Sequence, residues 1–365
     1  ATELGLTLGK KCGRCSTRYC GPECQVRHWK EGGHDKLCKP IKKAGGAEQY
    51  NANKKYTEAV AVAVEKCAED TKGQTCFICT QALHWKTKEG LVRGCACRGT
   101  AGFAHVSCLA EQAKILYAEA EENNLDHKVK DERWNRWHRC SLCEQRYHGV
   151  VNCALGWACW KTYLGGAEGN WARAAAMTTL ASGLFATGHY EDALSVQEAE
   201  LSMLQRVGAS EERILVAQNN LAATYARLRH FEQALRLKRD VYSGYLKIYG
   251  EDHRYTLEAA NNCANSLVGL KHFEEAKSLL LKTMPVVRRA LGENDETMLR
   301  MRRVYACALY RDGSATLANL REAVTTIEET EPIARRVFGG THPTTTGIET
   351  ALRQARATLR AREPK

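Results

Sequence analysis

His230-Phe-Glu-Gln-Ala-Leu235 is the middle one of three related hexapeptides that decide the fold of this chain. The other two are His189-Tyr-Glu-Asp-Ala-Leu194 and His272-Phe-Glu-Glu-Ala-Lys277, so the motif recurs after 41 and then 42 residues. A period of this length predicts one helical hairpin per repeat. We therefore expect the second half of the chain to be a mostly α, helical-hairpin repeat solenoid.

Within a repeat, apolar residues follow the 3.6-residue period of a helix. Leu221, Ala222 and Tyr225 precede the turn, and Phe231 and Ala234 follow it, which puts small residues where two helices must approach closely. These units resemble tetratricopeptide repeats of the long kind found in kinesin light chains. The resemblance implies a curved array over residues 166–338 and a capping helix in residues 339–365, with a concave face that binds protein or peptide segments.

Polar residues on the first helix of each hairpin are the candidates for this groove. They are Asn219, Asn220, Asn261, Asn262, Arg302 and Arg303. The alternative for Asn219 and Asn261 is that they only tie adjacent helices together. Asn220 and Asn262 are therefore our predicted partner-binding residues in the repeats.

Eight residues between Cys76 and Cys143 have the spacing of metal ligands. They form four close pairs, namely Cys76 with Cys79, Cys95 with Cys97, His105 with Cys108, and Cys140 with Cys143. Zinc takes thiolate and imidazole ligands in a tetrahedron, and a short turn can supply two of them, so the four pairs predict two complete Zn²⁺ sites. The alternative, ordinary buried cysteines of a reduced protein, does not account for four consecutive pairs.

The run Cys95-Ala-Cys97-Arg-Gly-Thr-Ala-Gly-Phe-Ala-His105-Val-Ser-Cys108-Leu109 resembles the centre of a RING-CH finger. The resemblance implies a cross-brace, with the first and third ligand pairs on one zinc and the second and fourth on the other. It also implies docking of a ubiquitin-conjugating enzyme, with Ile78 as the apolar contact. The family usually has Trp four residues after the sixth ligand, and Gln112 stands there instead, which favours a scaffold without ligase activity.

A second cysteine cluster, in residues 12–38, resembles the C-terminal part of a MYND finger. The resemblance rests on Cys12-Gly-Arg-Cys15, Tyr19-Cys20-Gly-Pro-Glu-Cys24-Gln25, Trp29 and His34-Asp-Lys-Leu-Cys38. It implies one whole zinc site on Cys12, Cys15, His34 and Cys38, with Cys20 and Cys24 as half of another. The family opens with one more Cys-x-x-Cys pair, whereas residues 1–11 contain no cysteine, so the finger is either truncated or a degenerate one-zinc form.

MYND fingers are interaction modules that bind short proline-containing peptides. The resemblance implies that Gln25 and Trp29 shape such a peptide groove. The alternative is that Trp29 simply packs over the zinc loops.

Composition bounds the class of protein. With 365 residues, 44% hydrophobic and 26% charged, the chain is long enough for two or three globular domains. It has no apolar run of membrane-spanning length and no hydrophobic signal core, so we expect a soluble, intracellular protein, cytoplasmic or nuclear, without a membrane partner. The odd number of cysteines, 17, fits a reducing compartment. The net charge of +11 comes largely from lysines without alternating aromatic residues, which argues against a nucleic-acid partner.

We expect a partial MYND-like finger in residues 1–45, a helical linker in 46–72 with its helix over 56–70, and a RING-CH-like finger with flanking helices in 73–165. Neither a nucleophile with its base nor a phosphate-binding loop stands out, so no residue is assigned a catalytic role. Two functions fit these features. The first is a RING-CH-type ubiquitin ligase that brings a conjugating enzyme and a substrate together by proximity, without a covalent intermediate. The second is a non-catalytic zinc-finger and tetratricopeptide scaffold.

Overall fold

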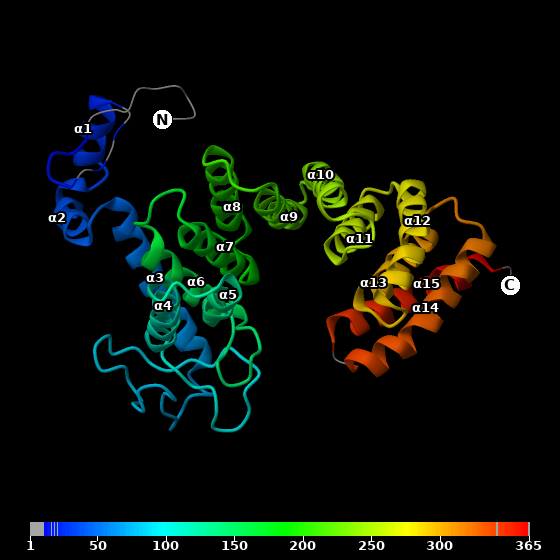
Figure 1. Ribbon diagram of the computed structural model, residues 1–365, viewed down its shortest axis with the longest axis horizontal. Helices are drawn as coiled ribbons and strands as arrows, with labels where there is room; N and C mark the ends of the chain where they lie inside the picture. Colours follow the sequence, from blue (N-terminus) through cyan, green and yellow to red (C-terminus); the bar gives the residue numbers. More distant parts are fainter. Residues whose placement is uncertain (1–10, 16, 18, 20, 341, 364–365) are drawn as a thin grey trace. The chain divides into compact units, whose positions relative to one another are not determined.

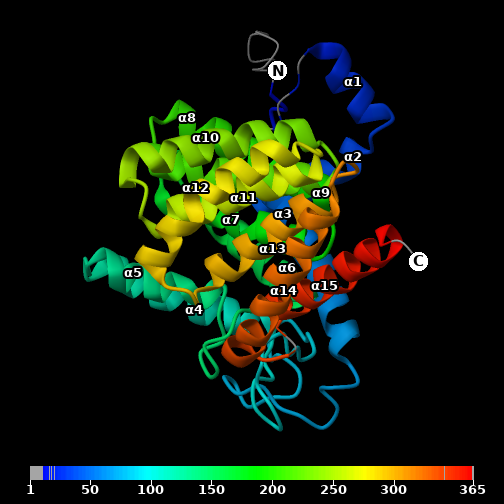
Figure 2. The same cartoon turned by 90° about the vertical axis from the view of Figure 1, so that its right-hand side faces the viewer.

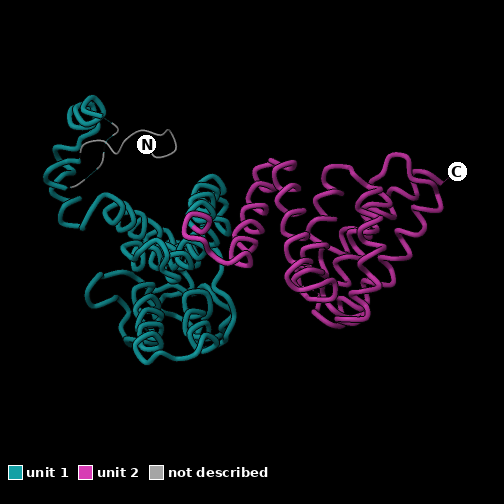
Figure 3. Tube along the Cα trace, turned by 45° about the horizontal axis from the view of Figure 1, so that its top comes forward, with its two compact units in different colours: residues 1–203 teal, residues 204–365 magenta. Residues whose placement is uncertain are grey.

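The computed structural model describes residues 11–15, 17, 19, 21–340 and 342–363. Over these residues the chain forms fifteen α-helices and one 3-10 helix, and two isolated β-bridges join described residues to each other. The chain divides into two compact units, residues 1–203 and 204–365, shown in different colours in Figure 3. The predicted class, a mostly α repeat protein preceded by clusters of cysteine and histidine, is confirmed.

The first unit begins with three helices, α1 (Pro22–Lys30), α2 (His34–Ala44) and α3 (Ala47–Cys67). Helix α2 ends at Gly45, whose φ of 94° is a conformation that glycine adopts without steric cost. The predicted linker helix starts nine residues earlier than expected. Its first turns are polar, and its buried side is a stripe of Ala52, Tyr56, Val60 and Ala63 at helical spacing.

A finger segment, residues 76–148, follows α3. It contains α4 (Val106–Glu122), α5 (His127–Trp134) and the short helix η1 (Asn135–Trp137) between loops that two β-bridges tie together, Val92 with Ala104 and Arg139 with Arg146. The tryptophans Trp134 and Trp137 are buried in the core of this unit.

Helix α6 (Gly149–Tyr163) is the apolar block that follows the finger segment, and it packs against α3, α4 and α7 (Trp171–Ala186). Two glycines allow α6 and α7 to approach closely. A Cβ on Gly156 would lie 3.0 Å from the Leu180 Cα, and one on Gly183 would lie 2.8 Å from the Cys153 Cα. Helix α6 is therefore at the centre of the first unit, among α3, α4 and α7 (Figure 1).

Helix α8 (Tyr190–Arg206) spans the division between the units, and the second unit then continues as helical hairpins. The helices are α9 (Glu211–Arg227), α10 (Phe231–Tyr249), α11 (Arg254–Gly269), α12 (Phe273–Leu291), α13 (Glu296–Tyr310), α14 (Leu317–Phe338) and α15 (Pro343–Arg362). Successive helices from α9 to α15 pack side by side, as Figures 1 and 2 show for α11 to α14.

The repeated hexapeptides start the second helix of each hairpin. Their alanines, Ala193, Ala234 and Ala276, are all buried, which confirms the reason for a small residue at that place. Gly250, Gly292 and Gly339 follow the ends of α10, α12 and α14 with φ between 85° and 92°. None of the described helices combines the length and the apolar character that crossing a membrane requires.

Candidate metal centres

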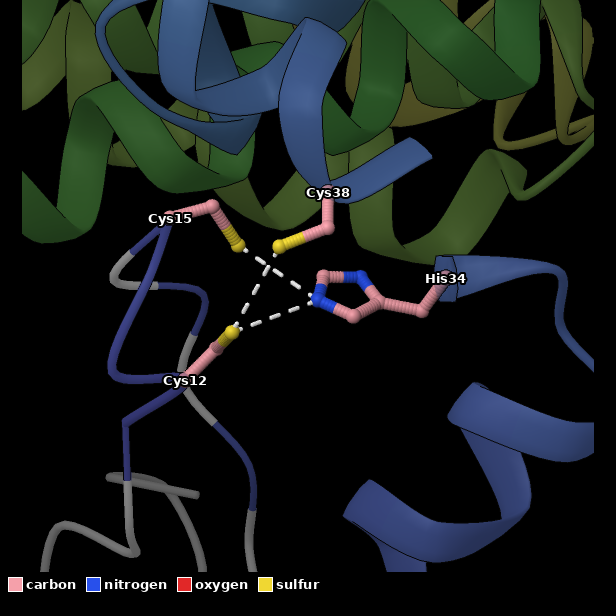
Figure 4. Close-up of side chains that lie close together, drawn as sticks. All are labelled: Cys12, Cys15, His34 and Cys38. Atoms are coloured by element: carbon pink, nitrogen blue, oxygen red, sulfur yellow. Dashed lines mark hydrogen bonds between the residues drawn. The ribbon is translucent and has the colours of Figure 1, made fainter. Parts of the chain in front are cut away.

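The N-terminal tetrad consists of Cys12, Cys15, His34 and Cys38, and all four side chains are buried (Figure 4). Cys12 and Cys15 come from one turn, which the Cys12 N–H closes by donating to the Thr17 carbonyl at 2.8 Å. His34 and Cys38 lie one turn apart in α2 and so share one face of that helix. Loop and helix together direct four ligand atoms at a common centre, within 4.8 Å of one another.

The distances inside this tetrad are those of a zinc tetrahedron. Zinc bonds of about 2.3 Å to sulfur and about 2.0 Å to nitrogen require edges of about 3.8 Å between two sulfurs and about 3.5 Å between sulfur and nitrogen. The Cys12 and Cys38 Sγ atoms are 3.8 Å apart, and the His34 Nε2 lies 3.5 Å from the Cys12 Sγ and 3.4 Å from the Cys15 Sγ. The tetrad therefore fits Zn²⁺ without rearrangement.

A second tetrad brings together Cys76, Cys79, His105 and Cys108. The His105 Nδ1 lies 3.3 Å from the Cys79 Sγ and 3.6 Å from the Cys108 Sγ, again the edges of a tetrahedron. The other ring nitrogen, Nε2, lies 3.3 Å from the Ala82 carbonyl oxygen, which fixes the ring so that Nδ1 faces the thiols. His105 is the residue directly before α4, and Cys108 lies in the first turn of that helix.

The third tetrad consists of Cys95, Cys97, Cys140 and Cys143. Its members alternate in sequence with those of the second tetrad, which is the arrangement of a cross-brace. Gly102 lies directly against it, with φ of 83°, and a Cβ there would come within 2.6 Å of the Cys97 Cβ and 3.2 Å of the Cys95 Sγ. Glycine is thus required beside the third tetrad on both steric and conformational grounds, and the ligand spacing alone did not point to it.

Two Cys-x-x-Cys turns have the same local structure. In each, the first cysteine N–H donates to the carbonyl five residues on, from Cys76 to Gln81 and from Cys140 to Gln145, both at 3.0 Å. The amides of Ile78 and Leu142 approach the Sγ atoms of Cys76 and Cys140 at 3.4 Å. Such N–H groups stabilise thiolates, the form that binds a metal.

Burial acts against ionisation of several of the same thiols. A hydrogen bond with His34 lowers the pKa of Cys12 to about 6, whereas burial raises the pKa of Cys38 to about 11. Burial also raises the pKa of Cys95 and of Cys108 well above the usual range. Neighbouring buried thiols can all be thiolates only if a cation compensates their charge, and a divalent metal supplies that charge. The three tetrads are consistent with zinc binding, and each offers four protein ligands, which leaves no open coordination position.

The remaining predicted site residues lie outside the tetrads. Ile78 and Trp29 are partly exposed, at 37% and 44%, and Gln25 is half-buried on α1. Cys24 is exposed on the same helix, and Cys20 lies outside the described residues. Their role as half of a further zinc site stays a prediction.

In the repeats, Asn220 on α9 and Asn262 on α11 are half-buried. Asn261 is buried, and its Oδ1 has no hydrogen-bond partner among the described residues. Asn261 thus faces the helix packing, and its role in tying adjacent helices together stays a prediction. Arg302 pairs with Glu293.

Comparison with known families supports two parts of the chain. Residues 5–38 match the MYND finger, and residues 217–289 match the tetratricopeptide repeat. No curated protein matches the chain at a significant level.

Several solved repeat structures are similar to the chain at low identity. The TPR-like repeats assigned to a kinesin light chain of Podosopora anserina share 18% identity, with a TM-score of 0.43, over 64% of this chain and 97% of that one. BtubC (BKLC) from P. vanneervenii shares 13% identity, with a TM-score of 0.42, over 71% of this chain and 92% of that one. The chain thus carries a zinc-binding MYND finger at its N-terminus and tetratricopeptide repeats in its second half.

Proposed function

We propose that the chain is a non-catalytic protein-interaction scaffold in which each tetrad holds one structural Zn²⁺ and the repeats bind a peptide segment of a partner. The observation that carries the proposal is the presence of two interaction modules, a MYND finger and tetratricopeptide repeats, in one chain. The closed tetrads agree with it, because a zinc ion with four protein ligands has no position for a substrate or a water.

The zinc ions act as cross-links in this proposal. The N-terminal tetrad joins its loop to α2, where Cys12, Cys15 and Cys38 form a small cluster with Tyr19 and Ile41. Among its described residues, the N-terminal finger has only this small apolar cluster, so the metal supplies much of its folding free energy. The second tetrad holds the turn at Cys76 to the start of α4. The third tetrad joins the loop at Cys95 to the turn at Cys140.

The repeat surface is the proposed site of the partner peptide. Asn220 and Asn262 are separated by one repeat period, so they occupy equivalent places on α9 and α11. Half-buried amides at regular intervals can each donate to and accept from the backbone of an extended peptide. On the MYND finger, Gln25 and Trp29 are the proposed contacts for a proline-containing peptide.

The test is selection of peptides on the full zinc-loaded chain, followed by affinity measurement on variants. Asn220→Ala and Asn262→Ala should each weaken repeat-bound peptides by about 1 kcal/mol or more, since each removes hydrogen bonds to the peptide. Gln233→Ala is the matched control, because Gln233 is an exposed amide on α10, the second helix of the hairpin that contains Asn220. If no peptide is selected, or if all three variants bind alike, the groove assignment is wrong.

A ubiquitin ligase is the second candidate, favoured by the partly exposed Ile78 on the first Cys-x-x-Cys turn of the alternating tetrads. In a reconstituted reaction with a broad panel of conjugating enzymes, the full chain would then stimulate discharge of ubiquitin, and Ile78→Ala would abolish this while zinc stays bound. If no conjugating enzyme responds to the zinc-loaded protein, the scaffold is the remaining candidate function. Gln112, in place of the family's tryptophan, would then explain the lack of ligase activity.

A further inference from the structure

The turn from His84 to Glu89 has the same backbone conformation as the two Cys-x-x-Cys turns. Of its two residues at the positions of the cysteines, only His84 is of a type that binds zinc. The His84 N–H donates to the Glu89 carbonyl at 3.0 Å, and the Lys88 N–H donates to the His84 carbonyl at 2.9 Å. The same two hydrogen bonds close the turns that begin at Cys76 and at Cys140. The fifth residue has positive φ in all three turns: 62° at Thr80, 59° at Lys88 and 55° at Glu144.

Protein hydrogen bonds take the place of the metal in this turn. His84 and Thr87 stand where the Cys-x-x-Cys turns have their two cysteines. The Thr87 Oγ1 lies 2.8 Å from the His84 Nδ1, and the Thr87 N–H donates to that same nitrogen at 3.1 Å. The turn is therefore held in one conformation while its middle residues, Trp85 and Lys86, face outward, with Trp85 68% exposed. A large aromatic side chain on a preorganised turn loses little entropy on binding, which suits it as an interface anchor.

Beside the turn lies a cavity of about 650 Å³, which residues of α3, α4 and α6 complete. Its charged lining consists of three lysines, Lys86, Lys114 and Lys161, and one carboxylate, that of Glu111. Glu111 already accepts a hydrogen bond from Lys114 at 3.2 Å. The positive charge of the lining thus exceeds its negative charge.

Lys161 on α6 is a half-buried charge of this lining without a close anion among the described residues. Its Nζ stands 3.5 Å from the centre of the Tyr56 ring, and this ammonium has neither an ion pair nor a hydrogen bond with any described residue. Burial lowers the pKa of Lys161, and Glu89 opposes that shift. The Glu89 carboxylate is itself bound at the start of α4, where it accepts from the Ser107 N–H at 2.7 Å and from the Ser107 hydroxyl at 2.9 Å. A half-buried ammonium without a close anion gains free energy when a ligand supplies one.

We propose that Trp85, Lys86, Lys114 and Lys161 form a docking site for an acidic segment of a partner protein. A carboxylate side chain enters the cavity between Lys161 and Lys114, and a neighbouring apolar side chain covers Trp85. A protein segment fits better than a nucleic acid, because a strand needs a series of aromatic platforms along a basic track and this site has one exposed tryptophan at a single cavity. All of its residues belong to the first unit, so the site is independent of the groove proposed on α9 and α11.

The experiment is fluorescence anisotropy on the full zinc-loaded chain with labelled peptides. The probes are Asp-Glu-Phe-Asp-Glu-Leu, its amide analogue Asn-Gln-Phe-Asn-Gln-Leu, and a panel in which the apolar residues of the acidic peptide are varied. We expect the acidic peptides to bind, the amide analogue to bind at least about tenfold more weakly, and the difference to shrink as salt is added. Lys161→Gln and Trp85→Ala should each weaken the acidic peptide about tenfold.

Two control variants separate this site from other effects. Lys66→Gln removes an exposed lysine of α3 that does not line the cavity, and Asn220→Ala alters only the repeats, so both should bind the acidic peptide like the unmodified chain. Zinc content and circular dichroism check that each variant folds. If Lys161→Gln does not fold, Lys86→Gln, a change at an exposed position, replaces it.

Four results would overturn the proposal. The first is that no acidic peptide of the panel binds, and the second is that the amide analogue binds with the same affinity as the acidic peptide. The third is that the cavity variants bind the acidic peptide as tightly as Lys66→Gln does. The fourth is that a single-stranded oligouridine binds through the same lysines more tightly than any peptide. The last result would assign the site to nucleic acid instead.

Discussion

At the scale of single residues, the ligand cysteines differ from the other cysteines of the chain in what surrounds them. Cys95 is buried beside three other thiols, whereas Cys67 is half-buried on α3 and lies 3.8 Å from the Arg93 carbonyl oxygen. Replacing Cys95 by Ser should unfold the finger segment, because each structural zinc contributes local folding free energy. Since that segment holds both the second and the third tetrad, the zinc content should fall from three ions per chain to one.

Elemental analysis together with circular dichroism tests this. Cys67→Ser, outside the tetrads, should keep three zinc ions, and the helical signal of the repeats should survive in both variants. A chain that carries one zinc ion or none before any substitution would contradict the assignment of the three tetrads.

Tyr305 provides a second prediction at this scale. It is buried on α13, its hydroxyl donates to the Glu322 carboxylate at 2.8 Å, and burial together with this hydrogen bond raises its pKa to about 12. The phenol therefore stays neutral in the folded chain after it has ionised in the unfolded chain. Its contribution to the free energy of unfolding is present below about pH 10 and is lost as the pH rises from about 10 to 12.

Tyr305→Phe should cost about 1 kcal/mol near pH 8, where the hydrogen bond is lost, and should make stability fall less steeply above pH 10. Urea unfolding at pH 8 and pH 11, followed by circular dichroism, measures both effects. Tyr255→Phe, at an exposed tyrosine, is the control. A pH dependence unchanged by Tyr305→Phe would mean that this phenol titrates normally in the folded chain.

At the scale of elements, the contact between α6 and α7 depends on glycine. A Cβ at Gly183 would meet the Cys153 Cα at 2.8 Å and the Asn152 carbonyl oxygen at 2.9 Å, and these are backbone atoms that cannot move aside. Gly183→Ala should therefore destabilise the first unit by about 1–3 kcal/mol, although alanine by itself favours a helix by about 1 kcal/mol.

Gly169→Ala is the control in the same unit, because no described atom lies within 4 Å of a Cβ built at Gly169 and its φ is not positive. It should be neutral or slightly stabilising. All seven tryptophans lie between residues 29 and 171, so tryptophan fluorescence during urea unfolding reports on the first unit. A Gly183→Ala variant as stable as the original chain would show that α6 and α7 can separate at little cost.

The bounds and contacts of an element can be predicted where its buried residues form a clear sequence pattern. The repeat hairpins were predictable, because the hexapeptide alanines Ala193, Ala234 and Ala276 are the buried residues and recur at a fixed period. The start of α3 was not, because its first turns are polar and part of its buried stripe is alanine, which carries little hydrophobic signal. The close approach of α6 to α7 was not predicted either, because a glycine in a sequence does not indicate which other helix packs against it.

The candidate sites followed the same rule. Ligand spacing identified the eight ligands between Cys76 and Cys143, since zinc geometry demands pairs of cysteine and histidine a few residues apart. Their division into two sites, and the N-terminal set, were implied by the resemblances to RING-CH and MYND fingers. The turn from His84 to Glu89 left no such signal, because His84 and Thr87 close it by hydrogen bonds that other residue pairs can also make. The lysines around its cavity come from three distant stretches of sequence, and only the packing of α4 and α6 brings Lys114 and Lys161 together.

At the scale of the whole molecule, we expect zinc to be coupled to the stability of the first unit only. The three tetrads all belong to residues 12–143, within the first unit, and no tetrad occurs among the described residues of 204–365. The second unit has instead a continuous apolar core that runs from Leu235 to Ala355. Because a ligand stabilises only the cooperative unit that binds it, zinc should stabilise the first unit and leave the second unchanged.

Removal of zinc from the full chain with an excess of chelator should therefore have a localised effect. Peptide-resolved hydrogen exchange should show fast exchange throughout residues 76–148 and in the N-terminal finger, while the amides of α11 to α14 keep their protection. Tryptophan emission should shift to the red, because Trp134 and Trp137 lie in the core of the first unit. Restoring zinc should reverse both changes. Equal loss of protection in α11 to α14 would mean that the chain unfolds as one cooperative unit, and unchanged exchange in residues 76–148 would mean that the second and third tetrads hold no metal.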